Sequence, residues 1–244
     1  MVEAADGMDG VADTLTARLA VGLTHDFRNY LLGIIGFAEL ATNTLPDGHP
    51  AHAHLRSMEA LATAASDAVT HLLDLARAGG EDPRPIDLAQ GLRALIQTLD
   101  RATPPTVRLT CEAPEALRAF ALPSLVNQGV ANLVLNAADA LPASGGTVGV
   151  RLTSRLDIDG AASVVIEVAD DGPGISPAVV RHLFERGFTT KSAGCGLGLP
   201  LVDAIAAAHG GRVEVESVPE RGSTFRIVIP HIPATSDEIG AASA

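Results

Sequence analysis

The sequence is poor in aromatic and in basic residues. Its 244 residues include no tryptophan, one tyrosine and 3% aromatic residues in all, and 29 acidic residues outnumber 17 basic ones, for a formal net charge of −12. Proteins that bind single-stranded nucleic acid stack the bases on aromatic side chains, and proteins that bind a phosphate backbone need a basic surface. We therefore expect no nucleic-acid partner, and any phosphate site must be local.

Cysteine and long apolar runs are also scarce. The two cysteines, Cys111 and Cys195, lie far apart, in the pattern of neither a disulfide framework nor a metal site. The sequence has no signal peptide and no apolar run of about 18 residues. It is nevertheless 47% hydrophobic, which is ample for packed cores. These features predict a globular, cytoplasmic chain without a membrane segment.

The first part of the chain has the pattern of a helical hairpin. Apolar residues recur at helical spacing from about 14 to 43, the breaker sequence TLPDGHP follows at 44–50, and a second helical segment runs from about 51 to 78. The first helix has a wider apolar surface than one partner helix covers, so we expect two copies to associate into a four-helix bundle. The prediction is an all-α, homodimeric domain at 13–80 after a disordered N-terminus at 1–12.

The pattern changes after RAGGEDPRP at 77–85, which is typical of a linker. Beyond it we expect helices at about 87–100, 122–141, 177–185 and 197–209, and strands in TVRLT, GTVGVRLTSRL, ASVVIEVAD, RVEVES and STFRIVIP. Short turns join several of the strands, which favours a mixed sheet with helices on one side over a doubly wound parallel sheet. The prediction is an α+β two-layer sandwich at 84–231 and a disordered tail at 232–244.

Polar side chains line one face of the predicted helix at 122–141. Asn132 and Asn136 are four residues apart, with Gln128 one turn before them and Asp139 one turn after. An ordinary amphipathic helix explains such a stripe about as well as a binding site does. Asparagine is a poor residue for the middle of a helix, however, and its carboxamide oxygen suits a Mg²⁺ ion that also carries phosphates.

Two glycine-rich turns follow this helix in the sequence. Asp170 ends a β-rich run, and Gly172 and Gly174 then enforce a tight path. A carboxylate in that place can accept a hydrogen bond from an exocyclic amine such as that of adenine, and a plain turn is the alternative. The sequence GCGLGL at 194–199 precedes a helix, where free amides favour a phosphate, and a flexible loop is the alternative.

The order of these segments resembles the catalytic core of two-component sensor histidine kinases, over about residues 14–230. Within THDFRNY at 24–30, HDFRN resembles the family's phosphoacceptor box. NLVLNAADAL resembles its N box, DDGPGI its first glycine box, LFERGFTTK its F box, GCGLGL its second glycine box and RGSTF its third element. Six elements in the family's order argue against a chance match. The resemblance implies a dimerisation and histidine-phosphotransfer hairpin followed by a Bergerat-type ATP-binding domain.

The phosphoacceptor box implies a reaction at His25. At about 100° per residue, His25 falls away from the apolar stripe of its helix and is expected to face outward. The resemblance makes it the residue that ATP phosphorylates, with Asp26 as its base and the receiver domain of a response regulator as the next acceptor. Asn29 matches a position linked to positioning water, which adds phosphatase activity. Arg28 departs from the HDFNN that is frequent among relatives, and the sequence does not explain it.

In the ATP domain, the resemblance assigns Asn136 to Mg²⁺ and Asp170 to the adenine amine. Asn132 stands where gyrase-like and chaperone ATPases carry a glutamate that activates water, so transfer to a histidine is favoured over hydrolysis. The other nucleotide-binding residues that the resemblance implies are Asp139, Gly172, Gly174, Lys191, Gly194, Gly196, Leu197, Gly198 and Thr224. The alternative function is a phosphotransfer and docking module whose nucleotide domain does not bind ATP.

Three features stand apart from this assignment. Only two residues separate the F box from GCGLGL, so the ATP lid is predicted to be short. Cys195 is expected to be a small residue that fits its place, with a redox-sensitive thiol as the alternative. His49, His52 and His54 lack acidic or cysteine partners at ligand spacing, so a solvated loop is favoured over a metal site.

Overall fold

The computed structural model describes residues 27, 29–78, 82–156, 162–185, 187–189 and 196–231. The chain divides into two compact units, Met1–Glu81 with Gly187–Leu197, and Asp82–Arg186 with Gly198–Ala244. Several residues of the predicted site lie outside the described ranges, namely His25, Asp26, Lys191, Gly194 and, beside them, Arg28 and Cys195. Within the described ranges, no helix is long and apolar enough to cross a membrane.

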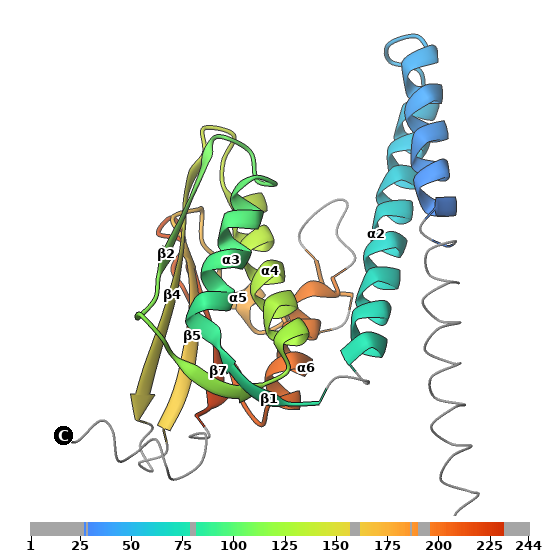
Figure 1. Cartoon of the computed structure of the whole chain (residues 1–244). Coiled ribbons are helices and arrows are strands. Elements are labelled where there is room, and N and C mark those ends of the chain that lie inside the picture. Colours follow the sequence, from blue (N-terminus) through green and yellow to red (C-terminus); the bar gives the residue numbers. More distant parts are fainter. Residues whose placement is uncertain are drawn as a thin grey trace, which may run out of the picture. The chain divides into compact units, whose positions relative to one another are not determined.

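The first unit contains a helical hairpin (Figure 1). Its first described helix covers residues 29–44, and α2 spans Ala51–Ala78, the range predicted for the second helix. Its buried apolar residues are small, with Ala38 only 2% and Ala62 only 5% exposed. Many of its large apolar side chains are instead exposed: Phe27, Tyr30, Leu32, Ile34, Phe37, Leu40, Met58 and Leu61. The hairpin therefore leaves a broad apolar surface uncovered.

Two histidines support the turn between the hairpin helices. The Nδ1 atom of His49 accepts a hydrogen bond from the Ala51 N–H at 3.2 Å, at the start of α2. The Nε2 atom of His52 lies 3.0 Å from the carbonyl oxygen of Pro46. Each histidine thus binds the backbone of its own turn.

The second unit is a two-layer α+β sandwich (Figure 1). Its five-stranded sheet has the order β2-β4-β5-β7-β6, with β2 and β4 parallel and the other neighbours antiparallel. The strands are β2 (Val107–Glu112), β4 (Gly146–Leu156), β5 (Ala162–Asp170), β6 (Arg212–Ser217) and β7 (Ser223–Pro230). Each of the five predicted β-rich runs forms one of these strands, so the predicted mixed sheet is confirmed.

Helices pack on one face of this sheet (Figure 1). They are α3 (Leu88–Asp100), α4 (Pro123–Ala140), α6 (Gly198–Ala208) and the short α5 (Pro177–Val180). Val130 and Val134 of α4 share a core with Val150 of β4 and Ile166 of β5, all at most 1% exposed. The prediction of a helix over 177–185 was too long, because residues 181–184 form turns.

Two short strands were missed by the sequence analysis. β1 (Arg84–Asp87) and β3 (Arg118–Ala121) pair antiparallel in a separate two-stranded sheet. β1 begins within the segment that was predicted to be a linker. It leads directly into α3, whose start is capped by the Asp87 carboxylate, an acceptor for the Ala89 and Gln90 N–H groups at 3.0 and 3.2 Å.

Charged side chains cross the other face of the five-stranded sheet. Glu112 and Arg151 lie 2.8 Å apart, Arg151 and Glu167 3.5 Å, Glu167 and Arg226 2.6 Å, and Arg226 and Glu216 2.8 Å. The ladder of alternating charge thus connects all five strands. Opposite charges on neighbouring strands attract one another, so this ladder favours the observed strand register on the face opposite the helices.

Candidate functional site

The first residue of α6 lies against the polar face of α4. A Cβ atom on Gly198 would lie 3.3 Å from Asn132 Oδ1 and 3.3 Å from Asn136 Nδ2. The Asn132 amide also donates a hydrogen bond to the Gln128 carbonyl oxygen at 3.0 Å, which fixes its orientation. The structure therefore brings two predicted elements together, the asparagine pair and the start of the helix that begins within GCGLGL. Two carboxamides beside the positive end of a helix can accommodate a phosphate with its cation.

His209 holds the other end of α6 against α4. The backbone N–H of Leu122, just before α4, donates to His209 Nε2 at 3.0 Å. The Nδ1 atom of His209 lies 2.8 Å from the Ile205 carbonyl oxygen, so Nδ1 carries the proton and donates. Contacts at both ends of α6 thus fix where its first turn lies on the asparagine face. His209 was not among the residues predicted from the sequence.

Asp170 and Ser223 form the second part of the site. Asp170 ends β5 and is paired with Ser223 across the β5–β7 ladder. Asp170 Oδ1 accepts a hydrogen bond from the Gly172 N–H at 2.9 Å. Burial raises the pKa of the Asp170 carboxyl above its ordinary value, and hydrogen bonds from Gly172 and from the backbone and hydroxyl of Ser223 oppose this rise. A partly desolvated carboxylate beside a hydroxyl is suited to receive an amine donor.

Glycine is required where the loop after Asp170 turns back on the sheet. A Cβ on Gly172 would lie 2.8 Å from Asp170 Oδ1 and 3.5 Å from the Ala140 carbonyl oxygen at the end of α4. Gly174 has φ +65°, and a Cβ there would come within 2.1 Å of the Val218 carbonyl oxygen. The loop therefore passes between Asp170 and the C-terminal end of α4, one turn beyond Asn136.

Ser217 ties this loop to the carboxylate through Ser223. Its hydroxyl oxygen accepts the Ile175 N–H at 2.7 Å and lies 3.0 Å from both Ser223 Oγ and the Gly222 carbonyl oxygen. A second tie comes from the Glu220 N–H, which donates to the Pro173 carbonyl oxygen at 2.7 Å. Residues at the β6–β7 turn thus support the loop at two residues, Pro173 and Ile175, although neither Ser217 nor Ser223 was predicted.

The structure also places two further predicted binding residues, Thr224 and Asp139. Thr224 pairs with Ala169 and follows Ser223 on β7. Since successive side chains of a strand point to opposite faces, Ser223 and not Thr224 faces Asp170. The alternation in STFRIVIP, where Ser223 shares a face with Phe225 and Ile227, was the available signal. Asp139 is exposed in the last turn of α4.

The described ends of the predicted lid meet each other. The Gly187 N–H donates to the Gly196 carbonyl oxygen at 3.2 Å. Gly196 has φ +64°, and a Cβ there would come within 2.5–2.7 Å of backbone atoms of Gly187 and Phe188. Leu197 follows and is partly buried, whereas Asn29 is exposed near the start of the first described helix.

The segment that carries these residues matches a known family of ATPases. Residues 121–233 match the family described as histidine kinase-, DNA gyrase B- and HSP90-like ATPase. The chain is 33% identical over 224 residues to the sensor histidine kinase ZraS of Klebsiella oxytoca, with 91% of this chain and 47% of ZraS covered. It is 32% identical over 228 residues to the sensory histidine kinase/phosphatase NtrB of Rhizobium meliloti (strain 1021), with 87% and 58% covered.

A solved structure also aligns with most of the chain. The crystal structure of full-length ShkA in complex with AMPPNP aligns with a TM-score of 0.59 and 25% identity, over 90% of this chain and 47% of ShkA. The chain spans about half the length of the curated relatives that it matches. It contains an ATPase domain of the histidine kinase, DNA gyrase B and HSP90 family, and it belongs among the catalytic cores of sensor histidine kinases.

Proposed function

We propose that the chain is an ATP-dependent protein histidine kinase that phosphorylates His25 and passes the phosphoryl group to an aspartate in the receiver domain of a separate response regulator. The observation that carries this proposal is the close approach of Gly198 to Asn132 and Asn136, which leaves little room for a side chain at residue 198. It brings a helix N-terminus onto two carboxamides in a domain of the histidine kinase-like ATPase family.

In the proposed complex, the two parts of the site hold opposite ends of ATP. The adenine amine donates to Asp170, and the Ser223 hydroxyl fixes the orientation of that carboxylate. The phosphates lie at the glycine-rich entry to α6, where backbone amides and the helix dipole favour negative charge. Asn136 is the proposed Mg²⁺ ligand, since a carboxamide oxygen fits a hard cation that keeps its charge for the phosphates. When bound, Mg²⁺ neutralises part of the negative charge of the triphosphate.

The chemical step needs a neutral imidazole at His25. The lone pair of one ring nitrogen forms a bond to the γ-phosphorus while the bond from that phosphorus to the β–γ bridging oxygen breaks, and ADP leaves with that electron pair. Asp26 accepts a hydrogen bond from the other ring nitrogen and stabilises the positive charge that develops. Asn132 carries no basic group, so it cannot activate a water molecule for attack. The phosphoryl group is therefore left to react with the histidine.

Homodimerisation through the hairpin is part of the proposal. Phe27, Tyr30 and Phe37 are 57%, 70% and 76% exposed on one hairpin. Monomeric proteins rarely expose apolar patches of this kind, and a second hairpin of the same sequence is suited to cover one. Asn29, exposed at the same helix, is the proposed residue for positioning water when a phosphorylated receiver domain is dephosphorylated.

Incubation with γ-labelled ATP and Mg²⁺ tests the kinase proposal. We expect label on the wild-type protein that acid removes and base does not, and none on His25→Ala or Asn136→Ala. Phe37→Ser serves to test the dimer and is expected to shift the chain towards monomer in sedimentation. A folded wild-type protein that exchanges phosphate with a phosphorylated receiver domain, yet binds no ATP, would establish the docking alternative instead.

A further inference from the structure

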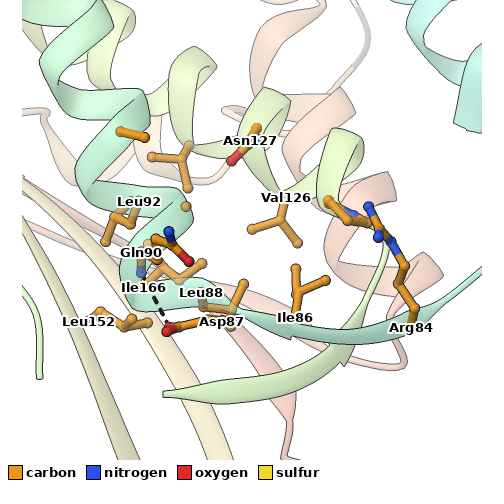
Figure 2. A pocket seen from close by; sticks show the side chains of 14 residues that line it. Arg84, Ile86, Asp87, Leu88, Gln90, Leu92, Val126, Asn127, Leu152 and Ile166 are labelled. Carbon is orange, nitrogen blue, oxygen red and sulfur yellow. Dashed lines mark hydrogen bonds between the residues drawn. The ribbon is translucent and has the colours of Figure 1, made fainter. Parts of the chain in front are cut away.

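A pocket of about 330 Å³ opens between the first halves of α3 and α4, away from the proposed ATP site. Its floor is formed by core residues of the sheet, Leu152 and Ile166, which are 2% and 1% exposed. A water molecule occupies about 30 Å³ in the liquid, so the pocket has the volume of roughly eleven waters and lies at the lower end of the range for small-molecule sites. Figure 2 shows its lining.

The pocket exists because α3 presents no side chain at its centre. Gly91 lies in the interior of α3, and a Cβ atom there would meet nothing within 4 Å. A glycine in a helix interior costs about 0.5–1 kcal/mol relative to alanine, and here no other side chain fills the space that it leaves. Leu92, Val126 and Val130 form apolar walls around this space.

Polar groups stand at the mouth of the pocket. Gln90 of α3 and Asn127 of α4 place a carboxamide on each side, and Arg84 of β1 lies at the edge (Figure 2). Among the residues that the structure describes, Arg84 has no ion-pair partner. The one acid of the lining, Asp87, accepts hydrogen bonds from the backbone N–H groups of residues 89, 90 and 117. The cation at the mouth is thus available to a ligand, while the carboxylate is already engaged.

The pocket and the proposed ATP site lie on opposite faces of α4. Pro123, Val126, Asn127 and Val130 line the pocket, and at about 100° per residue they form a stripe roughly 150° from the stripe of Asn132 and Asn136. A molecule in the pocket would therefore leave the asparagine face free.

We propose that this pocket binds a small monoanionic amphiphile, with an apolar body against Leu152 and Ile166 and a carboxylate that pairs with Arg84. The carboxamides of Gln90 and Asn127 hydrogen-bond the same head group. The apolar floor accounts for the body, and the uncompensated cation at an otherwise polar mouth accounts for the charge. This site does not depend on phosphoryl transfer, so its failure and that of the proposed kinase activity are separate results.

Three probes with one apolar body and different head groups test the proposal: 4-phenylbutyrate, 4-phenylbutyramide and 4-phenylbutylamine. Binding to the full chain is followed by NMR of labelled Ile, Leu and Val methyl groups with saturating ADP present. We expect the carboxylate to shift the methyl signals of Leu152, Ile166 and Val130, and to bind at least tenfold more tightly than the amide and the amine.

Variants separate the pocket from non-specific binding. Arg84→Gln is expected to remove the preference for the carboxylate, whereas the matched control Arg108→Gln, which removes an exposed charge on β2, keeps it. Gly91→Leu fills the pocket and is expected to abolish binding of all three probes while ADP still binds. Equal affinity for the three probes, loss of the preference in both arginine variants, or shifts confined to methyl groups near Gly198 would overturn the proposal.

Discussion

Replacing Gly198 by alanine should separate stability from nucleotide binding. Inside a helix, alanine stabilises the folded state by about 0.5–1 kcal/mol relative to glycine. At the first residue of α6 this stabilisation is no larger. The added methyl group would lie 3.3 Å from both Asn132 Oδ1 and Asn136 Nδ2, tighter than ordinary contact, so the carboxamides must shift. Losing one hydrogen bond to a charged group costs about 1.5–3 kcal/mol, which raises the Kd for Mg·ADP roughly ten- to hundredfold.

The matched control is Gly91→Ala, in α3 of the same unit. Its methyl group would meet nothing within 4 Å. This variant therefore has the stabilising effect of alanine in a helix without a close contact such as that of Gly198→Ala with the asparagines. Titration calorimetry with Mg·ADP and thermal unfolding of the nucleotide-free protein measure the two effects. We expect Gly91→Ala to raise the Tm by a few degrees and bind ADP like wild type. If folded Gly198→Ala also binds ADP within twofold of wild type, the asparagine face is not where the nucleotide binds.

Three further predictions concern the rest of the second unit. Ser217→Ala leaves the Ile175 N–H without its acceptor, at a cost of about 1–3 kcal/mol. It should lower the preference for ADP over GDP in competition binding. An unchanged preference would mean that Ser217 does not position the loop. Burial raises the pKa of Asp170 in the folded protein, so the fold loses stability as pH rises and this carboxyl ionises. Asp170→Asn should therefore raise the free energy of unfolding at neutral pH, measured by urea denaturation, and should abolish ADP binding. A variant that still binds ADP with wild-type affinity would contradict the assignment of Asp170 to the adenine. Hydrogen bonding to Arg226 lowers the pKa of Glu216, so this pair stabilises the fold above the ordinary glutamate pKa, and the stabilisation is lost as pH falls. Arg226→Met should be less stable than wild type at neutral pH and should lose less stability on acidification. Parallel curves of unfolding free energy against pH for the two proteins would argue against the ladder.

Local patterns sufficed to predict the main elements of the sandwich. The strand β5 has a run of apolar residues because it is buried between two neighbouring strands and beneath the helices. In α4, apolar and polar residues alternate at helical spacing, which predicts one apolar and one polar face. The pair of β1 and β3 was missed for a physical reason. Each strand has four residues, and the pairing of Arg84 with Ala121 joins positions far apart in the chain, so neither strand has a pattern of its own.

The site was predictable to the extent that its chemistry is carried by unusual residues. Two asparagines on one face of a helix and an aspartate before a glycine turn are uncommon enough to be noticed. Ser217 and Ser223 were not, because a serine in a strand has no distinctive spacing and only the register beside Asp170 gives it a role. The pocket at Gly91 was equally hidden, since the space that a glycine leaves depends on what packs around it.

Mapping the phosphorylated residue tests the central claim most directly. The protein is incubated with Mg·ATP, digested under alkaline conditions and analysed by electron-transfer tandem mass spectrometry, which preserves phosphohistidine. The account predicts one ATP-dependent phosphate on the peptide that contains THDFRNY, attached to His25. Stoichiometric release of inorganic phosphate with no phosphopeptide, or phosphate attached to a different residue, would contradict it.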